Sequence, residues 1–161
     1  GQRANVITYN SLIDGLCKNS QLDTAIALFN KMKDQGIQPD MYTFNILIDG
    51  MCKGGILKNA QEVFQDLLIK GYHLDVCTYN IIINGHCKEG LLDEALALLS
   101  KMENNGCIPD AITFEILIHA FFEEDENDKA QKLLREMNSR GLLKRQKVTP
   151  HFHIKSRFYC C

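Results

Sequence analysis

The sequence of 161 residues has no tryptophan, only three prolines and little excess charge. The formal net charge is −2, so the chain lacks the basic field that attracts nucleic acid non-specifically. No apolar run is long enough to cross a bilayer, and no targeting segment is visible. Ser-His-Asp arrangements, metal-ligand clusters and phosphate-binding loops are also missing, which argues against an enzyme, a metal site or a bound cofactor.

What the chain does contain is one eleven-residue segment written four times. The copies are TYNSLIDGLCK (8–18), TFNILIDGMCK (43–53), TYNIIINGHCK (78–88) and a decayed TFEILIHAFFE (113–123). They start 35 residues apart, and such a fixed period is typical of stacked repeats. The period divides the chain into repeats 6–40, 41–75, 76–110 and 111–145. Residues 1–5 are expected to end an earlier repeat, which would make the chain the C-terminal fragment of a longer array.

Each repeat has the apolar periodicity of two helices. The first helix of repeat one carries apolar residues at i, i+3, i+4 and i+7, namely Tyr9, Leu12, Ile13 and Leu16. The second carries Leu22, Ala25, Ile26, Leu28, Phe29 and Met32. Glycines at 36, 71, 106 and 141 stand where a helix end needs a left-handed residue, whereas Gly54 and Gly55 are interpreted as variation between copies. One helix pair cannot bury its apolar face alone, so we expect an all-α fold, a right-handed α-solenoid of helix-turn-helix repeats.

A polar set lies opposite the apolar stripe of each first helix. At 100° per residue, Ile7, Asn10, Asp14 and Lys18 fall within about 60° of one another. The equivalents are Tyr42, Asn45, Asp49 and Lys53, then Cys77, Asn80, Asn84 and Lys88. Because the asparagines lie off the core stripe, we predict that they are exposed and recognise a repeated hydrogen-bonding unit.

Three other interpretations of these polar positions stay open. The aspartates that end each repeat, Asp40, Asp75 and Asp110, would also serve as helix N-caps. The asparagines would also serve hydrogen bonding between neighbouring repeats, and the lysines would serve as ordinary solvated charge.

The seven cysteines would suggest a disulfide framework in a secreted chain. Here Cys17, Cys52 and Cys87 occupy one position of successive repeats, so their number reflects repetition. We expect them to be small, buried or half-buried apolar side chains in a reducing compartment.

Taken together, these motifs resemble the pentatricopeptide repeat of plant organelle proteins. The strings VITYNSLIDGLCK and LDTAIALFNKMKDQGIQPD look most like the 35-residue P-type class, which includes restorer-of-fertility proteins. The resemblance covers residues 1 to about 143. It implies sequence-specific binding of single-stranded organellar RNA, one base per repeat, in RNA processing, stability or translation. It also implies a mitochondrial location, with the chloroplast as the alternative, and processing factors as further candidate partners.

The resemblance also assigns roles to individual residues. The base would be read by the fifth and last residues of a repeat, which are Asn10 with Asp40, Asn45 with Asp75, and Asn80 with Asp110. The second residue would sandwich the bases, at Ile7, Tyr42, Cys77 and Ile112. The lysine ending the first helix would lie near phosphates, at Lys18, Lys53 and Lys88. Since Asn with Asp favours uracil in this family, the implied preference is U-U-U.

The fourth repeat departs from this pattern. Glu115 and Arg145 stand at the reading positions, Glu123 stands at the lysine position, and an acidic run continues to Glu126. Carboxylates along a phosphate path oppose RNA, so we expect a degenerate capping repeat.

Residues 146–161 form a basic tail. We expect it to be disordered, with RNA contact as the alternative. Its histidines and cysteines, His151, His153, Cys160 and Cys161, do not have the spacing of a structural zinc site.

The alternative function is a peptide-binding scaffold of tetratricopeptide type. That repeat has a period of 34 and a Trp in its signature, whereas this chain has a period of 35 and no Trp. A peptide groove also has no need of Asn and Asp in strict register. We expect neither a membrane nor a small-molecule substrate as partner. Three reading repeats would hold RNA only at roughly millimolar to high-micromolar strength.

Overall fold

The computed structural model describes residues 2–143, with side chains from Asn5 onward, as eight α-helices and no strand. The helices are α1 (Gln2–Lys18), α2 (Leu22–Asp34), α3 (Met41–Lys53), α4 (Leu57–Ile69), α5 (Val76–Lys88), α6 (Leu92–Asn104), α7 (Ala111–Glu123) and α8 (Asn127–Ser139). The all-α solenoid predicted from the repeat is confirmed. Residues 2–5, expected to end an earlier repeat, are helical and belong to α1.

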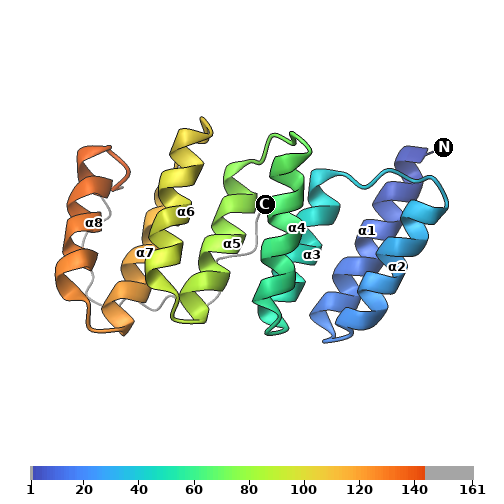
Figure 1. Ribbon diagram of the computed structural model, residues 1–161, viewed down its shortest axis with the longest axis horizontal. Helices are drawn as coiled ribbons and strands as arrows, with labels where there is room; N and C mark the ends of the chain where they lie inside the picture. The colour runs from blue at the N-terminus through green and yellow to red at the C-terminus, as the bar shows by residue number, and fades with distance from the viewer. Residues whose placement is uncertain (1, 144–161) are drawn as a thin grey trace.

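The helix pairs form a single row (Figure 1). Each odd-numbered helix packs against the next odd-numbered helix and against the even-numbered helix that follows it in the chain. In the described part of the chain, neighbouring even-numbered helices do not approach each other along their backbones. The odd-numbered helices therefore form one continuous layer. The even-numbered helices form a second layer outside it, in which neighbouring helices have no backbone contact.

The core lies between the two layers, at the positions that the periodicity indicates. The alanines at 25, 60, 95 and 130, predicted to allow close helix approach, are all completely buried. Leu12 is an exception, because 53% of it is exposed whereas its equivalents Leu47, Ile82 and Leu117 are buried. The prediction that Leu12 belongs to the core is wrong because no helix pair precedes α1 among the described residues to cover it.

Two turns per repeat require a left-handed residue. Gly36, with φ of +73°, ends α2 as predicted, and its equivalents do the same in later repeats. The turn between the two helices of a repeat also needs such a residue, filled by Gly55 at +77° but by Ser20 at +59° and Asp125 at +58°. The interpretation of Gly55 as mere variation is therefore wrong, because the backbone at this position favours glycine in every repeat.

The glycine inside each first helix has a packing role. A Cβ on Gly85 would lie 2.5 Å from the Sγ of Cys52, and one on Gly50 would lie 2.7 Å from the Sγ of Cys17. Each cysteine thus packs against the glycine of the next repeat. As predicted, these cysteines are half-buried free thiols, and burial raises the pKa of Cys52 to about 12.

Candidate nucleic-acid interface

Each of the aspartates predicted to read a base is the N-cap of the following helix. Asp40, Asp75 and Asp110 have extended backbones, and their carboxylates accept bonds from the backbone N–H of Thr43, Thr78 and Thr113 at 2.9, 2.9 and 3.0 Å. The N-cap interpretation is therefore correct for all three. An N-cap uses one carboxylate oxygen, so it leaves the other oxygen available for a ligand.

The asparagines are buried, and the prediction that they are exposed is wrong. Asn10 is 4% exposed, and Asn45 and Asn80 are each 8% exposed. The first turn of the next odd-numbered helix covers them, and its threonine hydroxyl donates to the asparagine Oδ1. These bonds are Thr43 to Asn10 at 2.6 Å, Thr78 to Asn45 at 2.7 Å and Thr113 to Asn80 at 2.6 Å. The asparagines therefore link neighbouring repeats, which was one of the open alternatives.

The threonine bond also fixes which way the asparagine amide points. With Oδ1 held by the hydroxyl, the Nδ2 group faces the aspartate, and it donates to Asp40 at 3.0 Å and to Asp110 at 3.2 Å in repeats one and three. Burial raises the pKa of Asp40, but bonds from Thr43 and Asn10 outweigh this and lower the pKa overall. The predicted reading partners of repeats one and three are thus brought together, and in repeat one the ionised, acceptor-only carboxylate of Asp40 lies beside an amide N–H.

The residues predicted to sandwich bases lie on the same helices, in the first turn of α3, α5 and α7 and further along α1. Ile7 is 60% exposed, Tyr42 50% and Ile112 38%, whereas Cys77 is half-buried. Three of the four thus present apolar surface to solvent, three residues before the reading position. Exposed apolar side chains in register have no folding role and suit stacking against flat ligands.

The lysines predicted to lie near phosphates differ between repeats. Lys18 is paired with Asp14 at 2.5 Å and Lys53 with Asp49 at 2.5 Å, each one helical turn apart. In repeat three Asn84 stands where Asp14 and Asp49 stand in the first two repeats, so Lys88 has no carboxylate at that position of its own helix. Exposed pairs of this kind contribute little to stability, so a phosphate could displace the carboxylate at low cost.

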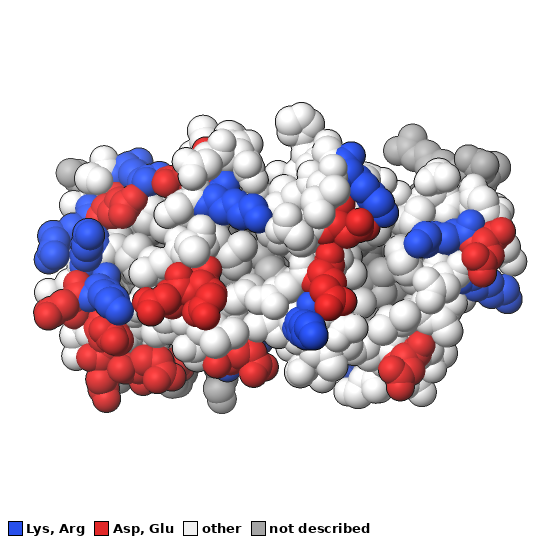
Figure 2. All heavy atoms as spheres, in the orientation of Figure 1, with Lys and Arg blue, Asp and Glu red and all other residues white. Residues whose placement is uncertain are grey.

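The fourth helix pair presents acidic residues where the others present asparagine and lysine. Glu115 is exposed, and Glu123 contacts His119 at 3.3 Å. Acidic side chains gather at the end of the molecule where α7 turns into α8 (Figure 2). Arg145, the other predicted member of this repeat's pair, lies outside the described residues, as does the tail 146–161.

The family follows from comparison of the sequence with known families. Models described as the PPR repeat family and the PPR repeat match residues 4–53 and 74–123, and residues 42–72 and 112–142. This chain belongs to the pentatricopeptide repeat (PPR) family. No curated protein matches the chain significantly.

Solved structures of PPR proteins have the same fold. The pentatricopeptide repeat protein PPR10 in complex with an 18-nt psaJ RNA element is 30% identical, with a TM-score of 0.79 over 85% of this chain and 20% of that one. A structure of PPR10 from maize is 28% identical, with a TM-score of 0.70 over 83% of this chain and 19% of that one. Nuclear proteinaceous RNase P 2 from A. thaliana is 15% identical, with a TM-score of 0.68 over 86% and 32%, which shows the fold alone. The chain spans about a fifth of the length of PPR10.

The sequence interpretation missed the role of the threonines that orient each asparagine. Thr43, Thr78 and Thr113 recur in strict register and begin each copy of the motif, which was the available signal. Within residues 2–143, no cluster of three metal-ligating side chains is present. No helix of that region is long and apolar enough to span a membrane.

Proposed function

We propose that this chain binds single-stranded RNA through the row of Asn–Thr–Asp sites along its odd-numbered helices, one base per repeat and without catalysis. The observation that carries the proposal is the recurrence of one oriented polar site at 35-residue intervals, in a family whose member PPR10 has been solved with RNA. Location in the mitochondrion, with the chloroplast as the alternative, and a role in organellar RNA processing, stability or translation are parts of the same proposal.

The chemistry of the site favours uracil. The oriented asparagine offers an amide N–H, which fits the carbonyl oxygen of a base, and the aspartate carboxylate is an acceptor that needs an N–H. Uracil presents both groups side by side on one edge, as does the larger base guanine, so the choice of uracil rests also on the resemblance to the family. Cytosine and adenine have an acceptor ring nitrogen in place of that N–H, so the carboxylate would repel them. Three such sites in repeats one to three give the proposed U-U-U preference.

Burial of the asparagine does not prevent this reading. In repeat one the exposed edge of the site is the free carboxylate oxygen of Asp40, and the Asn10 amide lies directly behind it. Ile7 and Tyr42 stand beside successive sites and would hold the base flat, while Lys18, Lys53 and Lys88 would face the phosphates. Because the bonds of the site exist before RNA arrives, binding need not pay to order these side chains.

The decisive test is an NMR titration of the isotopically labelled chain with short U-rich or A-rich single-stranded RNA. We expect the side-chain amide signals of Asn10, Asn45 and Asn80 to shift with U-rich RNA alone. The fourth repeat, with Glu115 at the reading position, is an internal control that should not respond. Equal shifts with both RNAs, concentrated at the lysines, would refute base reading. No shift at millimolar RNA would refute RNA binding by these repeats.

A further inference from the structure

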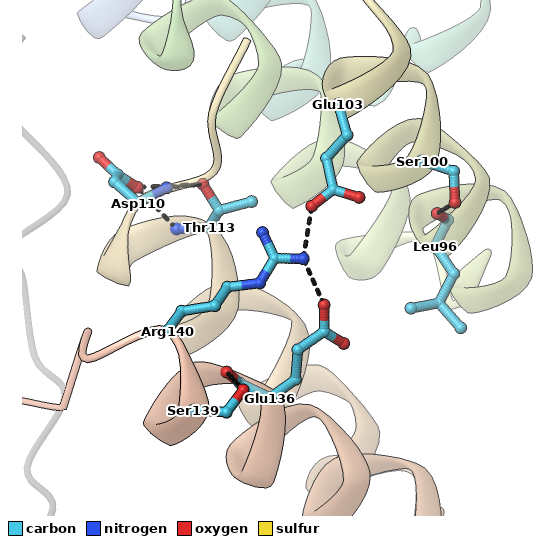
Figure 3. A network of polar contacts seen from close by, with 8 residues as sticks. All are labelled: Leu96, Ser100, Glu103, Asp110, Thr113, Glu136, Ser139 and Arg140. Carbon is cyan, nitrogen blue, oxygen red and sulfur yellow. Dashed lines mark hydrogen bonds and ion pairs between the residues drawn. The ribbon is translucent and has the colours of Figure 1, made fainter. Parts of the chain in front are cut away.

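An ion cluster ties the last two even-numbered helices together. The Arg140 guanidinium lies 2.6 Å from a carboxylate oxygen of Glu103 on α6 and 2.5 Å from one of Glu136 on α8 (Figure 3). It also lies over the ring of Phe114 at 5.2 Å. Because the backbones of α6 and α8 do not touch, these side chains bridge the gap between the two helices.

The three equivalent positions lie between α2 and α4, seventy residues earlier in the sequence, but the charge at one of them is reversed. Lys70 replaces Arg140 and Asp66 replaces Glu136, and the two are paired at 2.7 Å. Lys33 stands where Glu103 stands in the later cluster. The Lys33 ammonium lies over the Phe29 ring at 5.3 Å, and no carboxylate of residues 5–143 lies within ion-pair distance of it. Two cations thus occupy this junction, and the bridging carboxylate has no counterpart.

Between α2 and α4 the surface is hollowed into a cavity of about 470 Å³ (Figure 2). Lys33 and Lys70 both line this cavity. Much of its wall is apolar and includes Ile26, Phe29, Phe44, Val63, Leu67 and Tyr72. Tyr72 is 41% exposed. Its ring meets Phe44 edge-on at 5.8 Å, and Phe44 meets Phe29 in the same way. The groove therefore combines an aromatic wall with the cations of Lys33 and Lys70, of which only Lys70 is paired among the described residues, with the Asp66 carboxylate that also lines the groove.

We propose that this groove docks a protein segment that presents a carboxylate next to an apolar side chain. The carboxylate would bridge Lys33 and Lys70 as Glu103 contacts Arg140, and the apolar side chain would cover Phe29 and Tyr72. A nucleic acid suits the groove less well, because the aromatic rings already pack edge-on against one another and do not offer a free face for stacking on a base. None of the proposed base-reading residues lines the groove, so the proposal is independent of RNA binding.

The test is selection from a random peptide library displayed on phage, using the whole chain immobilised as bait. We expect enriched peptides to carry Asp or Glu beside an aromatic or large aliphatic residue. Lys33→Glu should weaken their binding by about tenfold or more, since it supplies an internal carboxylate and repels the incoming one. Lys31→Glu is the matched control, because it makes the same charge change on α2 outside the groove, and binding should persist.

A second readout separates loss of the site from loss of the fold. Lys33→Glu should raise the melting temperature, because the introduced carboxylate would pair with Lys70 as Glu103 pairs with Arg140, and Lys31→Glu should not. The proposal is overturned if no peptides are enriched, if the enriched peptides lack acidic residues, or if both variants bind them equally. Binding of U-rich RNA that Lys33→Glu abolishes and Lys31→Glu preserves would assign the groove to nucleic acid and overturn it as well.

Discussion

The first three helix pairs and the fourth differ in what their odd-numbered helices present. Asn10, Asn45 and Asn80 are each held by the threonine of the following helix, whereas the fourth pair carries Glu115 at that position. Lysine ends the first three odd-numbered helices, and Glu123 ends the fourth. Yet Phe114, Leu117 and Ala130 of the fourth pair are all completely buried.

The difference separates two demands that one sequence has to meet. The apolar stripe is needed wherever a helix pair stacks, so it persists through all four pairs. The Asn–Thr–Asp site persists only where another odd-numbered helix follows within the described residues. It therefore serves both the junction between repeats and, as proposed, the ligand, and variants can test these two roles separately.

The largest effect is expected from Thr78→Val. The change keeps the shape of the side chain but leaves the buried Oδ1 of Asn45 without its donor. An unsatisfied buried acceptor costs about 2 kcal/mol, which urea unfolding would measure. Thr24→Val is the matched control, because Thr24 is exposed on the surface of α2 and its substitution should change stability by less than about 0.5 kcal/mol. Equal losses from both variants would show that the junction does not depend on this bond.

A second contrast lies between Gly85 of the third repeat and Gly15, the equivalent glycine of the first repeat. Gly85→Ala should destabilise the chain by about 1–2 kcal/mol, because the new Cβ would lie 2.5 Å from the Sγ of Cys52 and 3.2 Å from Leu57. Gly15→Ala has nothing within 4 Å of its Cβ, so better helix propensity should leave stability unchanged or slightly raised. Thermal unfolding of the two variants side by side measures the difference. Two equal losses would mean that the glycines act through the backbone and not through packing.

The difference between repeats three and four can be reduced by substitutions that remove acidic side chains from repeat four. Glu115→Asn combined with Glu123→Lys gives the fourth repeat two features of the proposed interface. Affinity for U-rich RNA should rise by about threefold to tenfold, and its salt dependence should steepen by about one phosphate contact. Titrations at several salt concentrations measure both quantities. Lys132→Gln, a charge change on the exposed face of α8, should leave affinity nearly unchanged. An affinity that does not rise in the double variant would contradict the proposed phosphate path.

The periodicity of the sequence predicted the architecture because burial follows spacing. Ile13, Ala25 and Met32 recur at helical intervals and are buried where the pattern indicates. The burial of Asn10 could not be predicted from one helix, since the atoms that cover it belong to the next repeat. A helical wheel describes the direction of a side chain but not what stacks upon it. Leu12 shows the converse error, because its pattern is that of the core but its place at the end of the stack leaves it exposed.

The smallest effect is expected at the turn between the two helices of a repeat, where the first and fourth repeats differ from the second and third. Ser20 and Asp125 occupy the left-handed position that Gly55 and Gly90 fill in the middle repeats. Ser20→Gly should stabilise the chain by about 0.5 kcal/mol, because relief of the left-handed strain slightly exceeds the extra entropy of the unfolded glycine. Asp125→Gly should gain less, since aspartate tolerates this conformation better than serine. Ser20→Ala is the control, as it removes the hydroxyl without relieving the strain. If Ser20→Ala matched Ser20→Gly in thermal unfolding, the hydroxyl and not the backbone would explain the gain.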